Sequence, residues 1–176
     1  NNIKDIKNID DLELFIKNSN VSDLKKNANS TVISDGDEKS KIMIIGEAPG
    51  AEEDKVGIPF VGAAGQLLNK MLLAINLKRE SVYITNIIPW RPPNNRTPSN
   101  DEILECLPFV QRHIEIIKPK LILLLGSTAS KAILNSTESI ANLRGKWHEY
   151  KSINLIKGIN CLVTYHPAFL LRSPKF

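Results

Sequence analysis

The stretch GEAPGAEED places Glu47, Glu52, Glu53 and Asp54 within eight residues, directly after an apolar run. Carboxylates can position an attacking water or stabilise positive charge that develops during a reaction. The two glycines and the proline of the same stretch predict a tight corner that lets backbone amides approach a ligand. Stability alone does not account for this clustering, and we interpret the stretch as part of a chemical site.

Three more apolar runs end in polar or turn-forming residues. The runs are VYITNII (82–88), LILLLGS (121–127) and CLVTYHP (161–167), and they place Asn86 and His166 near the ends of predicted strands. Ligands of parallel sheets bind at the carboxyl ends of the strands. The sequence therefore predicts one site to which all four runs contribute.

The same runs indicate the fold class. Continuous apolar segments of this length are typical of parallel strands that are covered on both faces. Helical patterns lie between them at 63–77, 99–118 and 127–134, and the second begins with a capping box, Ser99-x-x-Glu102. Alternation of strand and helix predicts an α/β protein, a three-layer α/β/α sandwich with a central, mostly parallel four-stranded sheet.

The chain has 176 residues, of which 42% are hydrophobic. This is enough for one complete core and too little for two ordinary domains, so we expect a single domain over 1–176. Residues 1–40 are predicted to form a short helix (Asp11–Asn18) and a polar connection, and 41–176 to form the catalytic core. The chain begins without Met and ends at RSPKF, which leaves open a truncation of the core at its C-terminus.

Composition excludes several protein classes. No run has the length of a membrane span and no signal-peptide pattern is present, so we expect no membrane association and a cytoplasmic protein. Two cysteines cannot build a disulfide framework or a four-thiolate metal site. The net charge of +4 and the pI of about 9.0 permit binding to a polyanion, although an ordinary Lys-rich surface gives the same values.

Five blocks of the sequence, taken together, resemble the family 4 uracil-DNA glycosylases, in a variant that carries PWRPP. The blocks follow one another from about Lys41 onward: GEAPGAEED…GIPFVGAAGQLL, VYITNIIPWRPPNNRTPSNDEI, LILLLGSTASKAIL, LRGKWHEY and YHPAFLLRSPKF. The resemblance implies an enzyme of base excision repair that flips uracil out of DNA and hydrolyses its N-glycosidic bond, leaving an abasic site. It implies uracil-containing DNA, single- or double-stranded, as the partner, with nucleoid association during binding. We expect a monomer, because one pocket reaches one base.

The resemblance also implies roles for substrate-binding residues. Phe60 is expected to stack on the extruded uracil, and Glu53 to lie near uracil C5, where it would exclude the methyl group of thymine. The carboxamide of Asn86 can accept from uracil N3–H and donate to O4. Gly46 and Ala48 are expected to line the pocket. A core phenylalanine and a strand-end asparagine are the structural alternatives for Phe60 and Asn86.

Two residues are expected to be catalytic by the same resemblance. A neutral His166 would donate a hydrogen bond to uracil O2 and stabilise the negative charge on the leaving base. Glu47 would position the attacking water and stabilise the oxocarbenium-like sugar. Ala48 stands where another branch of the superfamily has a water-activating Asp, so stabilisation of the leaving group is expected to carry more of the rate. A histidine that only caps the turn before Pro167 is the structural alternative.

A DNA-contacting surface is implied by two segments. HPAFLLRS resembles a loop that enters the minor groove, and WRPPNNRTPS is a Pro-rich loop that carries two arginines. An apolar helix start is the alternative for the first segment, and Trp90 either stacks on DNA or packs internally. The expected DNA-binding residues are Leu170 and Leu171 as wedges, with Arg172, Ser173, Arg91 and Arg96 at phosphates. Asp54 is expected to hydrogen-bond the loop backbone, and Glu52 to be solvated.

The sequence departs from the family at the cysteines. Most family members hold a 4Fe–4S cluster with four cysteines, whereas here only Cys106 matches a ligand position. Pro89-Trp90 occupies the place of a Lys-Cys pair, and Cys161 lies in a predicted strand. One thiolate cannot hold four irons, so we expect no cluster and no other metal. Packing around Trp90 and the N-terminal helix is expected to replace it.

Two further functions remain open from the sequence. The first is a catalytically weak protein that binds uracil or damaged DNA, an option that Ala48 keeps open. The second is a nucleotide- or phosphate-binding α/β domain that uses the Gly-rich first turn. The second fits poorly, because GEAPG has neither the G-x-G-x-x-G spacing nor a P-loop Lys-Ser/Thr pair.

Overall fold

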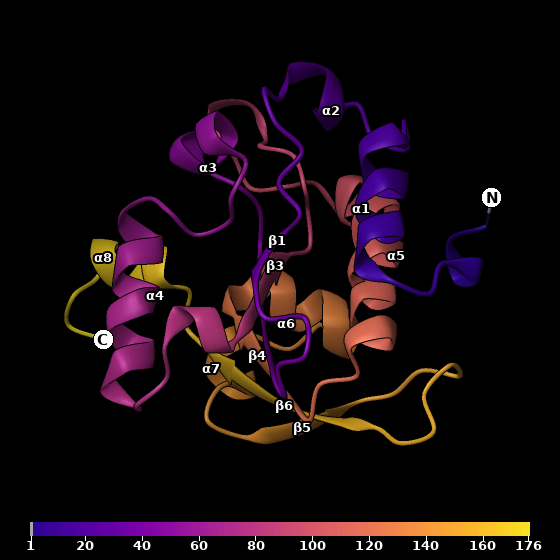
Figure 1. Cartoon of the computed structure of the whole chain (residues 1–176). Coiled ribbons are helices and arrows are strands. Elements are labelled where there is room, and N and C mark those ends of the chain that lie inside the picture. Colours follow the sequence, from indigo (N-terminus) through magenta and orange to yellow (C-terminus); the bar gives the residue numbers. More distant parts are fainter. Residues whose placement is uncertain (1) are drawn as a thin grey trace.

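The computed structural model describes residues 2–176 as one central sheet with helices on both of its faces (Figure 1). The strands are β1 (Ser34–Gly36), β2 (Ile42–Gly46), β3 (Tyr83–Asn86), β4 (Leu121–Leu125), β5 (Trp147–Tyr150) and β6 (Ile159–Thr164). The α-helices are α1 (Ile9–Asn18), α2 (Leu24–Asn27), α3 (Ala51–Val56), α4 (Ala63–Ala74), α5 (Asn100–Ile117), α6 (Gly126–Leu134), α7 (Ile140–Leu143) and α8 (Pro167–Arg172). Three short 3₁₀ segments complete the set, η1 (Ile3–Asp5), η2 (Arg79–Ser81) and η3 (Pro93–Asn95).

The sheet has six strands in the order β1-β3-β2-β4-β6-β5. The four strands predicted from the apolar runs form its parallel centre, which confirms the α/β class. The predicted number of strands was too small, because β1 and β5 add antiparallel edges. Both edge strands are short and contain no apolar run, so neither gives the pattern of a buried strand.

The sheet is covered on both faces because buried side chains alternate along its strands. In β2, Met43 and Ile45 face one core and Ile44 faces the other, and all three are fully buried. The first core is shared with α1, α5 and α6, and the second with α4. Figure 1 shows α4 and α8 on one side of the sheet, with α1 and α5 on the other. The three predicted layers are therefore present.

Strand register brings the predicted site residues to one edge of the sheet. Gly46 at the end of β2 pairs with Asn86 at the end of β3, and Leu125 pairs with Thr164. The chain leaves β2 toward β3 on one side and returns to β4 on the other side. Where the chain direction reverses in this way, a crevice opens at the carboxyl ends of β2 and β4, and α/β proteins bind ligands in such crevices. The expected common site lies at this crevice.

The N-terminal segment packs around a buried tryptophan, as the sequence predicted. Trp90 is fully buried, and its Nε1–H donates to Thr31 Oγ1 at 2.9 Å. Its ring meets Phe109 of α5 edge-on with centroids 6.0 Å apart, and Phe109 in turn meets Phe15 of α1. The alternative role of Trp90 in stacking on DNA is excluded by this burial. Within residues 2–176, no helix is long and apolar enough to cross a membrane.

A buried histidine makes the stability of this fold depend on pH. His113 of α5 is 2% exposed, and its Nδ1 lies 2.8 Å from the hydroxyl of Tyr83. Burial lowers the pKa of His113 from 6.5 to about 4, so the folded state keeps the ring neutral. The unfolded chain takes up a proton near pH 6.5, and the stability that is present above this pH is lost as the pH falls toward 4.

We predict that the free energy of unfolding of the wild type falls more steeply between pH 7 and pH 5 than that of His113→Gln. Between pH 7 and pH 5 the wild type should lose about 2 kcal/mol more of its free energy of unfolding than the variant, since each pKa unit corresponds to about 1.4 kcal/mol. Urea unfolding of both proteins at the two pH values measures it. Equal slopes would contradict a neutral, buried His113.

Candidate active site

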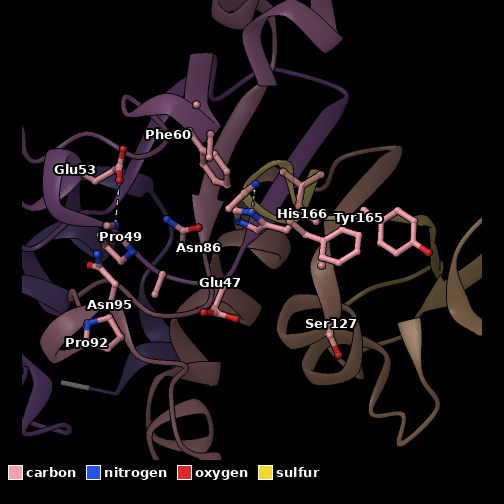
Figure 2. Close-up of a pocket in the computed structure, with 18 of the residues that line it drawn as sticks. Glu47, Pro49, Glu53, Phe60, Asn86, Pro92, Asn95, Ser127, Tyr165 and His166 are labelled. Atoms are coloured by element: carbon pink, nitrogen blue, oxygen red, sulfur yellow. Dashed lines mark hydrogen bonds between the residues drawn. The ribbon is translucent and has the colours of Figure 1, made fainter. Parts of the chain in front are cut away.

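A cavity of about 660 Å³ opens at the carboxyl edge of the parallel strands. Most of the predicted site residues line it, and Figure 2 shows Glu47, Glu53, Phe60, Asn86 and His166 around it. The predicted residues that line the cavity are Glu47, Ala48, Glu53, Phe60, Asn86, Arg96, His166 and Arg172. Those that do not line it are Gly46, Arg91, Leu170, Leu171 and Ser173.

Asn86 presents a buried acceptor to the cavity. Its side chain is 6% exposed, and among residues 2–176 its Oδ1 is the one buried side-chain oxygen or nitrogen without a hydrogen-bond partner. Such an atom costs roughly 1–3 kcal/mol if it stays unpaired. Gly46 allows this placement, because a Cβ there would lie 2.6 Å from Asn86 Oδ1 and 2.4 Å from Phe60 Cζ. Gly46 itself does not line the cavity, so its expected place in the lining is wrong, and its contribution is the space that it leaves for Asn86 and Phe60.

His166 is a neutral hydrogen-bond donor held at the start of α8. Its Nδ1 accepts from the backbone N–H of Ala168 at 3.0 Å, so the single proton of the neutral ring lies on Nε2. The pKa of His166 is lowered from 6.5 to about 4, mainly by burial and to a smaller extent by the charge of Arg172, while the charge of Glu53 acts in the opposite direction. The capping role and a role as donor use different ring nitrogens, so the two interpretations of this residue are compatible.

Glu47 is oriented by a residue that sequence analysis missed. Thr128, in the first turn of α6, donates its hydroxyl to Glu47 Oε2 at 2.6 Å. This bond joins the loop after β2 to the helix after β4 and therefore spans the crevice between these strands. This bond fixes one carboxylate oxygen, while the other has no hydrogen bond from the protein. The only sequence signal was the GST that follows the third apolar run.

Phe60 forms an aromatic wall beside His166. Its side chain is 6% exposed, and its ring stacks on the His166 imidazole with centroids 5.6 Å apart and an interplanar angle of 25°. Phe60 has a φ of +54°, which a bulky residue rarely adopts. The structure therefore holds this ring at the cavity in spite of an unfavourable backbone conformation.

The other three carboxylates of the acidic stretch have separate tasks. Glu53 accepts from the N–H groups of Gly50, Val61 and Gly62 at 3.0, 2.9 and 2.7 Å, which ties two loops of the site together. Asp54 is buried and accepts from the N–H groups of Asn29 and Ser30, so the loop backbone that it binds belongs to the N-terminal connection. Glu52 is exposed, as predicted. The role of Glu53 near uracil C5 stays a prediction.

The predicted DNA-binding segment HPAFLLRS forms the short helix α8. The alternative interpretation, that this segment begins a helix, is therefore confirmed for its secondary structure. Leu171 is 48% exposed on it, Leu170 is half-buried, and Ser173 follows its last turn. In the Pro-rich loop, Arg91 donates to Asn95 Oδ1 at 2.7 Å. Arg96 forms a two-pronged ion pair with Glu102. Contact of these residues with DNA stays a prediction.

Two aromatic residues of the cavity were also missed by sequence analysis. Tyr165 and Phe169 line it with ring centroids 4.8 Å apart, and the guanidinium of Arg144 lies 4.5 Å from the centre of the Tyr165 ring. Their spacing of four residues across the start of α8 was the available signal, because such residues meet on one face of a helix.

The cysteines do not fit an iron–sulfur cluster. Cys106 and Cys161 are both fully buried, and burial raises the pKa of their thiols to about 12 and about 11. The thiolate form that binds iron is thereby disfavoured. In the part of the chain that the structure describes, no group of three or more His, Cys, Asp or Glu side chains could hold a metal ion.

Comparison with known proteins shows the family of this chain. The model of the uracil DNA glycosylase superfamily matches residues 33–176. The chain is 41% identical to the type-4 uracil-DNA glycosylase of Pyrobaculum aerophilum, over 93% of this chain and 84% of that protein. It is 40% identical to the type-4 enzyme of Archaeoglobus fulgidus, over 97% of this chain and 86% of that protein. Identity to the type-5 uracil-DNA glycosylase of P. aerophilum is 26%, over 76% of this chain and 63% of that protein. The resemblance found in the sequence motifs is confirmed.

We predict that Glu53→Gln lowers the free energy of unfolding by about 1–3 kcal/mol. A glutamine has one acceptor oxygen for three backbone N–H groups, and its NH₂ would face at least one of them. Glu52→Gln is the matched control, since Glu52 is an exposed neighbour and its substitution is expected to change stability by less than about 0.5 kcal/mol. Urea unfolding at neutral pH compares the two. An equal effect of both substitutions would show that the loop contacts of Glu53 do not stabilise the fold.

Proposed function

The chain belongs to the uracil-DNA glycosylase superfamily, and we propose that it flips uracil out of DNA and hydrolyses the N-glycosidic bond. The product is an abasic site that base excision repair then processes. The family match and the identity to type-4 enzymes over most of the chain support this activity. The phosphate-binding alternative has no comparable support.

The observation that carries the proposal is the unpartnered Oδ1 of Asn86 in the same cavity as the neutral His166. An acceptor that lacks a partner fits N3–H of uracil, and the amide N–H of Asn86 fits O4. Cytosine presents an acceptor at N3 and a donor at C4, so it would leave buried polar groups unpaired. The stacked ring of Phe60 provides the apolar face that a planar base needs.

The reaction can be assigned to residues of this chain. As the bond between the sugar C1′ and uracil N1 breaks, its electron pair moves onto the base and negative charge grows on O2. His166 would donate its Nε2–H to this oxygen, and a neutral donor in a buried site stabilises such charge without changing its own protonation. Water then adds to C1′, and its proton neutralises the released base. Glu47, with one oxygen fixed by Thr128, would position this water and stabilise the positive sugar.

The DNA would reach the cavity across α8 and the Pro-rich loop. Leu171 is half exposed and would fill the place of the flipped base together with Leu170. Arg172, Ser173, Arg91 and Arg96 would bind phosphates, and the net charge of +4 supports contact with a polyanion. We propose that a monomer acts on single- or double-stranded DNA, in the cytoplasm and at the nucleoid.

The protein is proposed to act without an iron–sulfur cluster. The donor set supports this, because one thiol at a matching position and one in β6 cannot supply four thiolates. The edge-on contacts between Trp90, Phe109 and Phe15 give this region its own packed core.

We predict that the purified protein releases uracil from an oligonucleotide with a single U, and releases no base from matched oligonucleotides with T. His166→Ala is expected to lower the single-turnover rate by about 10²-fold, because a lost hydrogen-bond donor to a developing oxyanion costs this much. Glu47→Gln is expected to have a smaller effect. The assay cuts abasic sites with alkali and resolves the fragments by electrophoresis.

His148→Gln is the matched control, since the Nε2 of this histidine contacts the backbone oxygen of Leu143 and the residue does not line the cavity. It should keep the wild-type rate. Rates that are unchanged in both His166→Ala and Glu47→Gln would refute the assignment of catalysis to this site. DNA binding without any excision would favour the binding protein over the enzyme.

A further expected outcome concerns iron. The purified protein should be colourless in the visible range and contain no iron, and it should keep its excision rate after treatment with an iron chelator. The donor set gives the reason, because two buried cysteines cannot supply the four thiolates that a 4Fe–4S cluster needs. Iron analysis and an absorbance spectrum of the same sample provide the measurement. A brown protein that loses activity with chelator would refute this.

A further inference from the structure

We propose that Arg79 is a positioning residue that holds Phe60 in place as the stacking wall of the uracil pocket. The inference rests on the proposed function and adds to it a residue outside the cavity. Arg79 lies in η2, just before β3, and does not line the pocket. Its side chain is 15% exposed, which is low for an arginine.

The guanidinium of Arg79 binds two consecutive backbone carbonyl groups, those of Pro59 and Phe60. Nη1 donates to the carbonyl oxygen of Phe60 at 2.6 Å, and Nη2 donates to that of Pro59. Nε donates to Asp35 Oδ2 at 3.0 Å, and Nη1 also reaches Asn69 Oδ1 at 3.1 Å. Contacts from β1 and α4 therefore fix the guanidinium, and the fixed guanidinium fixes the turn.

This turn needs to be held because its backbone conformation is unfavourable. The φ of +54° at Phe60 is rare for a residue with a large side chain. Gly65 at the start of α4 permits the conformation, because a Cβ there would lie 2.0 Å from the carbonyl carbon and oxygen of Phe60. The absence of a side chain at Gly65 makes room for the positive φ of Phe60 but does not favour it over other conformations. The two hydrogen bonds from Arg79 to the carbonyls of Pro59 and Phe60 do favour it.

The opposite side of the same turn is held by an anion. Glu53 accepts from the N–H groups of Val61 and Gly62, the two residues that follow Phe60. A cation thus binds the carbonyl groups before and at the aromatic residue, and a carboxylate binds the amides after it. Together the two contacts fix the direction in which the Phe60 ring leaves the backbone.

The position of Arg79 in the chain also links the two surfaces that receive the base. The segment that begins with η2 continues into β3, which ends at Asn86. Through Arg79, the ring of Phe60 is therefore linked to β3, the strand that carries the amide of Asn86. Lysine would replace the arginine only in part, because a single ammonium cannot bind two carbonyls and two side chains in the planar arrangement of a guanidinium.

The first readout is the placement of Phe60, and it does not depend on activity. The Phe60 ring is stacked on the His166 ring, so its ring current shifts the imidazole proton resonances of His166. The chain has three histidines, which makes assignment of their NMR signals direct. Phe60→Ala should abolish this shift and Arg79→Met should reduce it. An unchanged shift in Arg79→Met would overturn the proposal.

The second readout is the single-turnover rate of uracil excision in a double-mutant cycle. Arg79→Met and Phe60→Ala are each expected to lower the rate by about 10- to 100-fold, since a displaced binding group costs this order. If Arg79 acts through Phe60, the double variant is no slower than Phe60→Ala alone. Multiplicative losses in the double variant would overturn the proposal.

Arg112→Met is the matched control, because Arg112 also binds a backbone carbonyl, that of Ile6, and lies outside the cavity. It should keep both the shift and the rate. Arg79→Lys keeps the charge and serves where Arg79→Met does not fold, with a smaller change in both readouts expected. A wild type that excises no uracil, together with a shift that Arg79→Met reduces, would refute the proposed function and leave the placement of Phe60 by Arg79 supported.

Discussion

The parallel pairing of β2 with β3 and β4 is the interaction on which the site depends. It aligns Gly46 with Asn86 by register and sets the start of α6 across the crevice from Glu47. The pairing of β4 with β6 then places His166, two residues beyond the end of β6, at the same edge. Glu47, Asn86 and His166 follow or end three different strands, so a slip of one residue in either pairing would move one of them away from the others.

Several site residues are held in states that cost stability by themselves. Asn86 keeps a buried oxygen unpaired, His166 is kept neutral by burial, and Phe60 has a positive φ. Contacts around the site offset these costs: Glu53 and Arg79 bind the turn at Phe60, and a backbone amide binds the imidazole. The strain is local, and the fully buried strands below it supply the rigid support.

The sequence predicted those features whose signal is local. Apolar runs identified the four parallel strands, and the residues that follow them identified Asn86 and His166. The edge strands β1 and β5 were not predicted, because they are short and carry no apolar run. Thr128 and Arg79 escaped for a different reason, since their partners lie 81 and 19 residues away and meet them only through the sheet register and the packing of the loops.

The acidic stretch shows why residue type alone does not assign a role. Its four carboxylates differ in what surrounds them: a threonine hydroxyl at Glu47, backbone amides of the site loops at Glu53, amides of the N-terminal connection at Asp54, and solvent at Glu52. A carboxylate whose oxygens are taken by backbone amides fixes a loop, and one that keeps an oxygen free can act on a ligand. Glu47 and Glu53 are the carboxylates of this stretch that line the cavity, and of the two only Glu47 keeps an oxygen without a hydrogen bond from the protein. This difference favours Glu47 over Glu53 as the group proposed to act on the sugar.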